Sequence, residues 1–287
     1  MAVDFSFAIQ QINQRLRAVE GFDEFRPGGP GGNARYAQKC LEAAKVSYEF
    51  LKKNPEYHMI ERGIFRTGHY PTPDEDDRMW ASVEMWETTG DPNYRRDFER
   101  GTWLNDDKIN LYWDWNNVKN LAMFTYLMSK RDGKREGLVA DIRNDLLTTA
   151  DILVAKAKKD VYGRCLGGEY RWGCNGGLAR MTITLMMANK VSPNPDYVNA
   201  ARDAIDHIFG RNYYGRSYVT GLGHKPPMRP HDRRSGADRV REPWPGYIIV
   251  GGHSATGWKD VQEDATTNEV CINWQGALVY ALAAFAD

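Results

Sequence analysis

Apolar residues recur at helical spacing along almost the whole chain, and this periodicity constrains the fold more than any other feature. The longest example runs from Gly137 to Lys158, and its inward face carries Leu138, Ile142, Leu146, Ala150 and Leu153. Hardly any stretch alternates apolar and polar residues as a half-buried strand does. The pattern therefore predicts an all-α fold of about nine helices, paired by short turns.

Capping and breaking residues predict where several of these helices begin and end. The acidic run 74–77 places negative charge at the positive end of a helix whose inner face holds Met79, Val83 and Trp86. Gly90-Asp91-Pro92 should end that helix, and Asp196 is predicted to cap a later one that stops at Gly210. A first helix is expected over residues 5–19, before a glycine-rich loop at 27–32. Periodicity alone does not separate a toroid of helix pairs from a solenoid or a bundle.

The charge balance and hydropathy exclude two classes of partner. Lys plus Arg and Asp plus Glu both number 38, so the net charge is zero and the electrostatic footprint of a nucleic-acid binder is missing. No apolar run reaches membrane-spanning length, so we expect no membrane partner either. Nine Trp and fifteen Tyr suit a neutral carbohydrate, whose apolar ring faces stack on flat aromatics, although aromatic residues also dominate cores. The four cysteines have no metal-site spacing, so no metal ligand is predicted.

Two polar stretches near the C-terminus carry the candidate chemistry. The first, residues 217–233, is stiffened by prolines and glycines and ends with His231 and Arg233. The second, residues 258–269, holds Asp260 and Glu269 immediately before an apolar helical pattern. Two carboxylates beside a helix start could do acid–base chemistry. They could equally be a solvated loop acid and a helix-capping acid, and the residue types alone leave both interpretations open.

These stretches resemble the two C-terminal signatures of glycoside hydrolase family 9, a family of mostly endo-acting cellulases. The first matches at every defined position, from Ser217 through Gly223 and Lys225 to His231 and Arg233. The second keeps Trp258, Asp260 and Glu269 at the family's carboxylate spacing. It departs from the family pattern at four positions, which are Ala265, where the family has an aromatic, and Cys271, Gln275 and Gly276.

The resemblance implies an (α/α)6 barrel, a toroid of twelve paired helices. About nine of the twelve are predicted here, so the chain resembles the C-terminal two-thirds of one catalytic domain, and we expect residues 1–287 to form a single domain of that kind. An incomplete barrel exposes apolar inner faces, which favours self-association. The family is secreted, although Met1-Ala2-Val3-Asp4 lacks the features of a secretory signal.

The same resemblance implies roles for individual residues. Glu269 would be the general acid, Asp260 would support it or the central sugar, and His231 and Arg233 would hydrogen-bond sugar hydroxyls. Three aromatic residues are candidate stacking platforms, with core packing as the alternative for each: Trp172, Tyr170 and Trp115. No cofactor is expected; calcium, which some family members bind, has no identifiable site here.

The implied function is an inverting endo-hydrolase of β-1,4-glucan. Inverting enzymes need a second carboxylate that activates water, and in this family that base belongs to an Asp-Ala-Gly-Asp motif that the sequence does not contain. Two alternatives follow from the missing motif: a catalytically inactive glucan-binding fragment, or one half of a complemented enzyme. A further alternative gives the role of base to Asp260.

Overall fold

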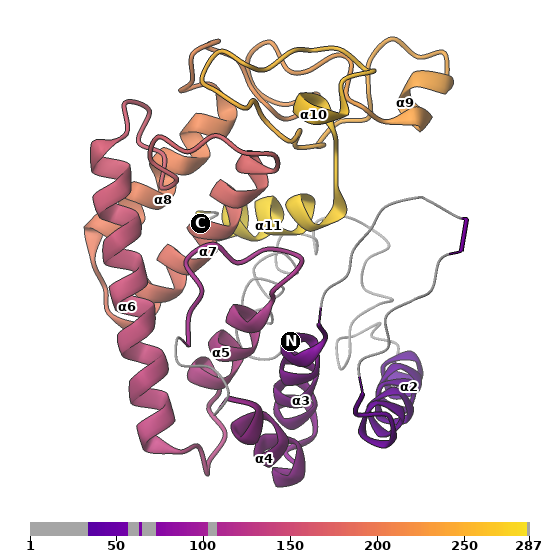
Figure 1. The fold of residues 1–287 in the computed structure, drawn as a ribbon, viewed down its shortest axis with the longest axis vertical. Helices are drawn as coiled ribbons and strands as arrows, with labels where there is room; N and C mark the ends of the chain where they lie inside the picture. The colour runs from indigo at the N-terminus through magenta and orange to yellow at the C-terminus, as the bar shows by residue number, and fades with distance from the viewer. Residues whose placement is uncertain (1–33, 57–62, 65–72, 103–107, 286–287) are drawn as a thin grey trace. The chain divides into compact units, whose positions relative to one another are not determined.

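The computed structural model of the protein describes residues 34–56, 63–64, 73–102 and 108–285, and helices dominate them (Figure 1). In this part of the chain β-pairing is limited to three isolated bridges, Val219↔Ile248, His231↔Glu269 and Ile249↔Val270. The predicted first helix (5–19) and the glycine-rich loop (27–32) lie outside the described residues.

Ten helices are described: α2 (Ala34–Lys53), α3 (Glu75–Thr89), α4 (Pro92–Gly101), α5 (Lys119–Met128), α6 (Glu136–Lys159), α7 (Cys174–Val191), α8 (Pro195–Phe209), α9 (Arg233–Ala237), α10 (Ala265–Asn268) and α11 (Ile272–Ala283). Eight of them were predicted from periodicity. The other two, α9 and α10, are each shorter than two helical turns, so they carry no periodic pattern that sequence analysis could detect.

The chain divides into two compact units. The first comprises Met1–Asn110 and Trp115–Ile142, and the second comprises Leu111–Asp114 and Arg143–Asp287. Helix α6 begins in the first unit and continues in the second, and its five predicted core residues are all buried. The single-domain organisation stays a prediction.

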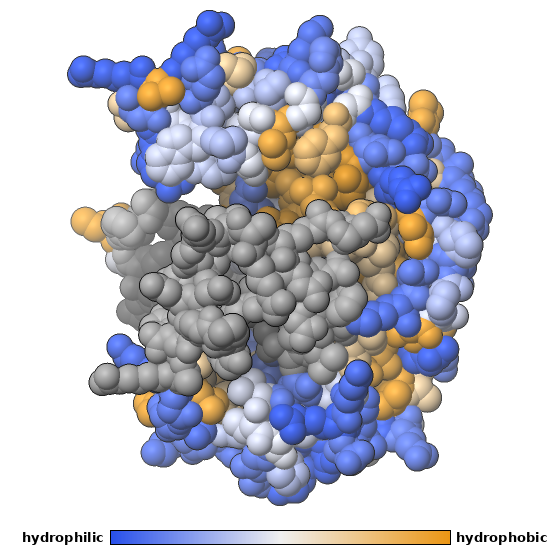
Figure 2. All heavy atoms as spheres, turned by 180° about the vertical axis from the view of Figure 1, so that it is seen from behind, coloured by the Kyte–Doolittle hydropathy of each residue, from blue (hydrophilic) through white to orange (hydrophobic). Residues whose placement is uncertain are grey.

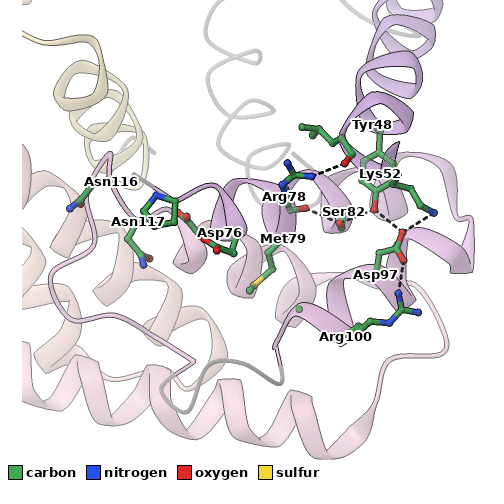
Figure 3. A pocket seen from close by; sticks show the side chains of 14 residues that line it. Tyr48, Lys52, Asp76, Arg78, Met79, Ser82, Asp97, Arg100, Asn116 and Asn117 are labelled. Atoms are coloured by element: carbon green, nitrogen blue, oxygen red, sulfur yellow. Dashed lines mark hydrogen bonds and ion pairs between the residues drawn. The ribbon is translucent and has the colours of Figure 1, made fainter. Parts of the chain in front are cut away.

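A polar network joins α2, α3 and α4 in the first unit (Figure 3). The Tyr48 hydroxyl donates to the Asp97 carboxylate at 2.9 Å and lies 2.9 Å from the Ser82 hydroxyl. Lys52 and Arg100 form ion pairs with the same carboxylate at 3.3 and 3.6 Å. These residues line a pocket of about 610 Å³, and their mutual bonds indicate that its polar wall holds the helices together.

Helix ends in the first unit follow the predicted capping chemistry. Gly90 adopts the left-handed conformation (φ 77°) after α3 and donates its N–H to the Trp86 carbonyl. Asp91 then caps α4 by accepting from the Asn93 N–H at 2.8 Å, and Pro92 occupies the first helical turn. The stop predicted at Gly90-Asp91-Pro92 is therefore confirmed.

The core of the second unit consists of α7 packed against α8 and α11. Helix α7 is buried almost throughout its length, and Trp274 of α11 is fully buried beside it. One capping prediction was wrong: Asn194, not Asp196, caps α8, because its side chain accepts from the Asp196 N–H at 3.0 Å. Pro195 starts the helix one residue before Asp196, which leaves Asp196 in the first turn.

Irregular chain gathers between α8 and α11, and Figure 1 draws it as loops that carry α9 and α10 at one end of the second unit. A small hydrophobic cluster lies within these loops, formed by Tyr218, Ile249 and Trp258, with Tyr214 and Val270 packed against it. The Tyr214 hydroxyl also donates to the Trp258 carbonyl at 2.9 Å. The loops are therefore supported by a hydrophobic cluster of their own.

The surface is mixed in character. Seen from behind, hydrophilic residues cover much of the described surface, with hydrophobic residues in patches between them (Figure 2). None of the helices in the described ranges has the length and apolarity needed to cross a bilayer.

The contact between α7 and α11 depends on glycine at one position. A Cβ added to Gly176 would overlap the Trp274 indole, whereas a Cβ on Gly177 would meet nothing closer than Arg171 Nη2 at 3.8 Å. We expect Gly176→Ala to destabilise the protein by about 1–3 kcal/mol through overpacking. The matched Gly177→Ala change should be neutral or stabilising, because alanine favours the helix by about 0.5–1 kcal/mol over glycine.

Thermal unfolding of the two variants checks this prediction, because each kcal/mol of lost stability lowers the melting temperature by about 2–4 °C. Equal melting temperatures for Gly176→Ala and Gly177→Ala would contradict the packing argument.

Candidate active site

The two polar stretches predicted from the sequence meet through their backbones. The His231 N–H donates to the Asn268 carbonyl at 2.8 Å, and His231 forms a parallel bridge with Glu269. On the other side of Glu269, its carbonyl accepts from the Val250 N–H at 2.8 Å. The segment 268–270 is thus held between two other segments of the second unit.

This pairing fixes the positions of His231 and Glu269. Paired segments lie about 4.8 Å apart, and residues opposite each other project their side chains to the same side. Glu269 is extended (φ −69°, ψ 154°) and half-buried. Its carboxylate has no hydrogen-bond or ion-pair partner among the described residues, so it is available to a ligand.

Glu269 does not cap the following helix. Helix α11 begins at Ile272 and its N-cap position is Cys271, so the carboxylate lies upstream of the helix terminus. The alternative interpretation of Glu269 as a helix-capping acid is therefore wrong.

The imidazole of His231 is oriented by a second bond. Its Nδ1 lies 2.5 Å from the carbonyl oxygen of Gln262. Because a carbonyl oxygen only accepts, Nδ1 must carry the proton in this bond. Nε2 is then the ring atom that remains for a ligand.

Asp260 organises the loop that leads to His231. Its carboxylate accepts the N–H groups of Met228 and Arg229, both at 2.9 Å, and pairs with Arg216 at 3.3 Å. The carboxylate thus gives a hydrogen-bond acceptor to two backbone N–H groups that the irregular loop would otherwise leave unpaired. Asp260 is not the solvated loop acid that the sequence left open; its predicted part in the reaction stays a prediction.

Arg233 is the first residue of α9, and Asp232 caps this helix. The Asp232 side chain accepts from the N–H groups of Arg234 and Ser235 and from Arg234 Nε at 3.2 Å. Burial opposes ionisation of Asp232, but these hydrogen bonds prevail and lower the pKa of its carboxyl. Arg233 itself is exposed, and within the described residues it makes no ion pair.

The three predicted stacking aromatics differ in their surroundings. Trp172 is 42% exposed and lies edge-on to Trp274, with ring centroids 5.0 Å apart. Tyr170 lies under the buried Arg164 guanidinium at 3.6 Å, and burial raises the pKa of its hydroxyl. Trp115, in the first unit, is 40% exposed. Tyr170 is half-buried against Arg164, whereas Trp172 and Trp115 keep exposed surface for a ligand.

Asn268, a residue that was not predicted from the sequence, joins most of these parts. Its amide donates to the Arg229 carbonyl and its side-chain oxygen accepts from Trp258 Nε1 at 3.2 Å, while its backbone carbonyl holds His231. The residue is fully buried. Its place directly before Glu269 was the only signal that could have indicated this role.

A metal site does not emerge from the described ranges, where no group of three or more His, Cys, Asp and Glu side chains could hold an ion. The calcium site considered from the sequence stays untested. A pocket of about 360 Å³ adjoins the His231 loop and is lined in part by Met228, Arg229, Pro230 and Gln262.

Comparison with known protein families shows which family this chain belongs to. The profile of glycosyl hydrolase family 9 matches residues 30–282. The chain belongs to glycosyl hydrolase family 9.

Similar proteins agree with this assignment. The chain is 56% identical to endoglucanase D of Acetivibrio thermocellus over 265 residues, which is 92% of this chain and 42% of that protein. It is 28% identical to a xyloglucan-specific endo-beta-1,4-glucanase of Bacteroides ovatus over 313 residues, covering 100% of this chain and 51% of the relative. The chain thus spans about half or less of the length of these relatives.

Solved structures confirm the predicted fold class. A metagenome-derived family 9 endoglucanase superposes with a TM-score of 0.80 at 28% identity, over 97% of this chain and 51% of that one. The all-α fold of the (α/α)6-barrel type is therefore confirmed, and the partial coverage agrees with the prediction of an incomplete set of helices.

The bonds of Asp260 generate a prediction about the loop. In Asp260→Ala the amides of Met228 and Arg229 lose their acceptor, so we expect their hydrogen exchange to accelerate at least about tenfold, equivalent to about 1.4 kcal/mol of local opening. Glu263→Ala removes an exposed carboxylate from the same segment and should leave both amides unchanged. Unaltered exchange in Asp260→Ala would show that the carboxylate does not hold the loop.

Proposed function

We propose that this chain provides the proton donor and the central sugar contacts of an endo-acting β-1,4-glucan hydrolase. The observation that supports this most is that Glu269 pairs with His231 while its own carboxylate has no hydrogen-bond or ion-pair partner among the described residues. The similar proteins from A. thermocellus and B. ovatus carry endoglucanase names, which point to the same substrate class.

Glu269 is assigned as the general acid. Its half-buried carboxyl group would give its proton to the oxygen of the glycosidic bond as that bond breaks. Because His231 is paired with Glu269, its Nε2 would face the same side and hydrogen-bond a sugar hydroxyl, and the exposed Arg233 would hold a second one. Trp172 would stack on a sugar ring.

Asp260 is assigned to positioning rather than to water activation. Both of its carboxylate oxygens already accept hydrogen bonds from the His231 loop or from Arg216. A base must take a proton from water on the opposite face of the sugar, and no residue of this sequence is assigned to that task. The substrate is a polysaccharide found outside cells, so we place the activity there.

Replacing Glu269 tests the acid. Glu269→Gln keeps the shape of the side chain but removes its proton, so reducing-end release from carboxymethylcellulose should fall roughly 10²–10⁴-fold. Retention of the variant on insoluble cellulose should remain, because the sugar contacts are intact.

The outcomes separate the candidate functions. Release that survives in Glu269→Gln would exclude Glu269 as the acid. Retention without release by the unmodified chain would favour the glucan-binding alternative. Neither retention nor release by the unmodified chain would exclude both functions.

The role of His231 can be separated from its structural bond. Asparagine places an amide nitrogen near the position of Nδ1, so His231→Asn can still donate to the Gln262 carbonyl while it lacks Nε2. We expect roughly 10²-fold lower retention or turnover, through lost positioning, at an unchanged melting temperature. Wild-type function in His231→Asn would show that Nε2 does not touch the sugar.

A further inference from the structure

An exposed tryptophan lies on the loop that follows α9. Trp244 is 47% exposed and stands between Pro243 and Pro245, which restrict the backbone on either side. Its carbonyl accepts from the hydroxyl of the buried Thr220 at 2.6 Å. The same hydroxyl accepts from the Tyr247 N–H at 2.9 Å, and the Gly246 N–H reaches the Thr220 carbonyl at 2.7 Å. The loop is thus pinned while its largest side chain faces solvent.

The neighbours of Trp244 add polar groups around its ring. The guanidinium of Arg234 lies over the Trp244 ring, 5.2 Å from its centroid, and donates to the Tyr247 hydroxyl at 3.1 Å. The Trp244 and Tyr247 rings are 6.5 Å apart with an interplanar angle of 32°. We call these three residues the Trp244 patch. A single exposed apolar residue needs no explanation, but a rigid aromatic surface edged by hydrogen-bonding groups matches a ligand with apolar faces and hydroxyl edges.

The patch is linked to the candidate active site through Asp232. Asp232, between His231 and Arg233, both caps α9 and pairs with Arg234, so one carboxylate sets the positions of a predicted sugar contact and of the patch. The wall of the pocket of about 360 Å³ includes Ser235 and Pro243, the chain neighbours of Arg234 and Trp244, together with Gln262, whose carbonyl holds His231.

Charged groups of both signs surround the patch. Asp232 pairs with Arg234, and the pocket wall carries Arg229 and Arg241 together with Glu263. Hydroxyl groups both donate and accept hydrogen bonds, so they can bond with either kind.

We propose that the Trp244 patch is an outer sugar-binding subsite that stacks on a ring of the same β-glucan chain, beyond the units held at His231 and Glu269. This inference rests on the proposed function and adds a preference for longer chains: a short oligosaccharide fills the site near Glu269, and only a longer one reaches Trp244.

Binding measured without turnover tests the subsite. In the Glu269→Gln background, isothermal titration with cellobiose and with cellohexaose gives two dissociation constants for each variant. Adding Trp244→Ala should weaken cellohexaose binding roughly tenfold, the size of a lost stacking contact, and leave cellobiose binding unchanged. Trp244→Phe keeps a ring and should recover most of the loss.

A matched control and the contrary outcomes complete the test. Tyr213→Ala removes an aromatic ring that is 59% exposed and outside the patch, and it should change neither constant. Equal cellohexaose binding in Trp244→Ala and its parent would overturn the subsite while the proposed function stands. An equal loss for both ligands would also overturn it.

Two further results are distinguishable. If Trp244→Ala leaves sugar binding intact but shifts sedimentation toward a smaller species, the patch is a protein contact and the proposal is wrong. If the Glu269→Gln parent binds neither oligosaccharide, the proposed function fails, and the subsite fails with it.

Discussion

The backbone hydrogen bond from His231 to the Asn268 carbonyl is the contact on which the candidate site depends. It joins the segment that precedes α9 to the last residue of α10. One such bond contributes only about 1 kcal/mol net, so it cannot hold the segments unaided. Its persistence requires the groups around it: the Asn268 amide on the Arg229 carbonyl, Asp260 on the amides of the preceding loop, and the Gln262 carbonyl on the imidazole.

Polar side chains take over, in these loops, the work that regular structure does elsewhere. Buried irregular backbone must find hydrogen-bond partners, and fully buried Ser217, Thr220 and Asn268 supply them. The Ser217 hydroxyl accepts from the Val219 N–H at 3.0 Å, and the Thr220 hydroxyl bridges the Trp244 carbonyl and the Tyr247 amide. These three side chains therefore stabilise the backbone of the loops that carry His231, Arg233 and Glu269.

The helices were predictable because their signal is local. The buried face of α6 follows directly from periodicity, and Gly90 ends α3 for a reason contained in a few residues. The pairing of His231 with Glu269 has no such signal, since it depends on contacts between distant segments; the family resemblance supplied the two residues but not their geometry. Asp260 shows most clearly what the sequence does not predict. Its carboxylate accepts from two backbone amides, but in the sequence it cannot be told from a solvated loop acid.

The position of Glu269 is finally set by the core of the second unit. Trp274, five residues along the chain, packs against α7 at Gly176, where the absence of a side chain allows the indole to approach the helix. That contact anchors the start of α11, and the short extended segment before it carries the carboxylate to the bridge with His231. The general-acid role proposed for Glu269 requires its carboxylate to be held to within a fraction of an ångström of its productive position. Here the core anchors one end of the segment and the loop hydrogen bonds anchor the other, so a change at either end should move the carboxylate.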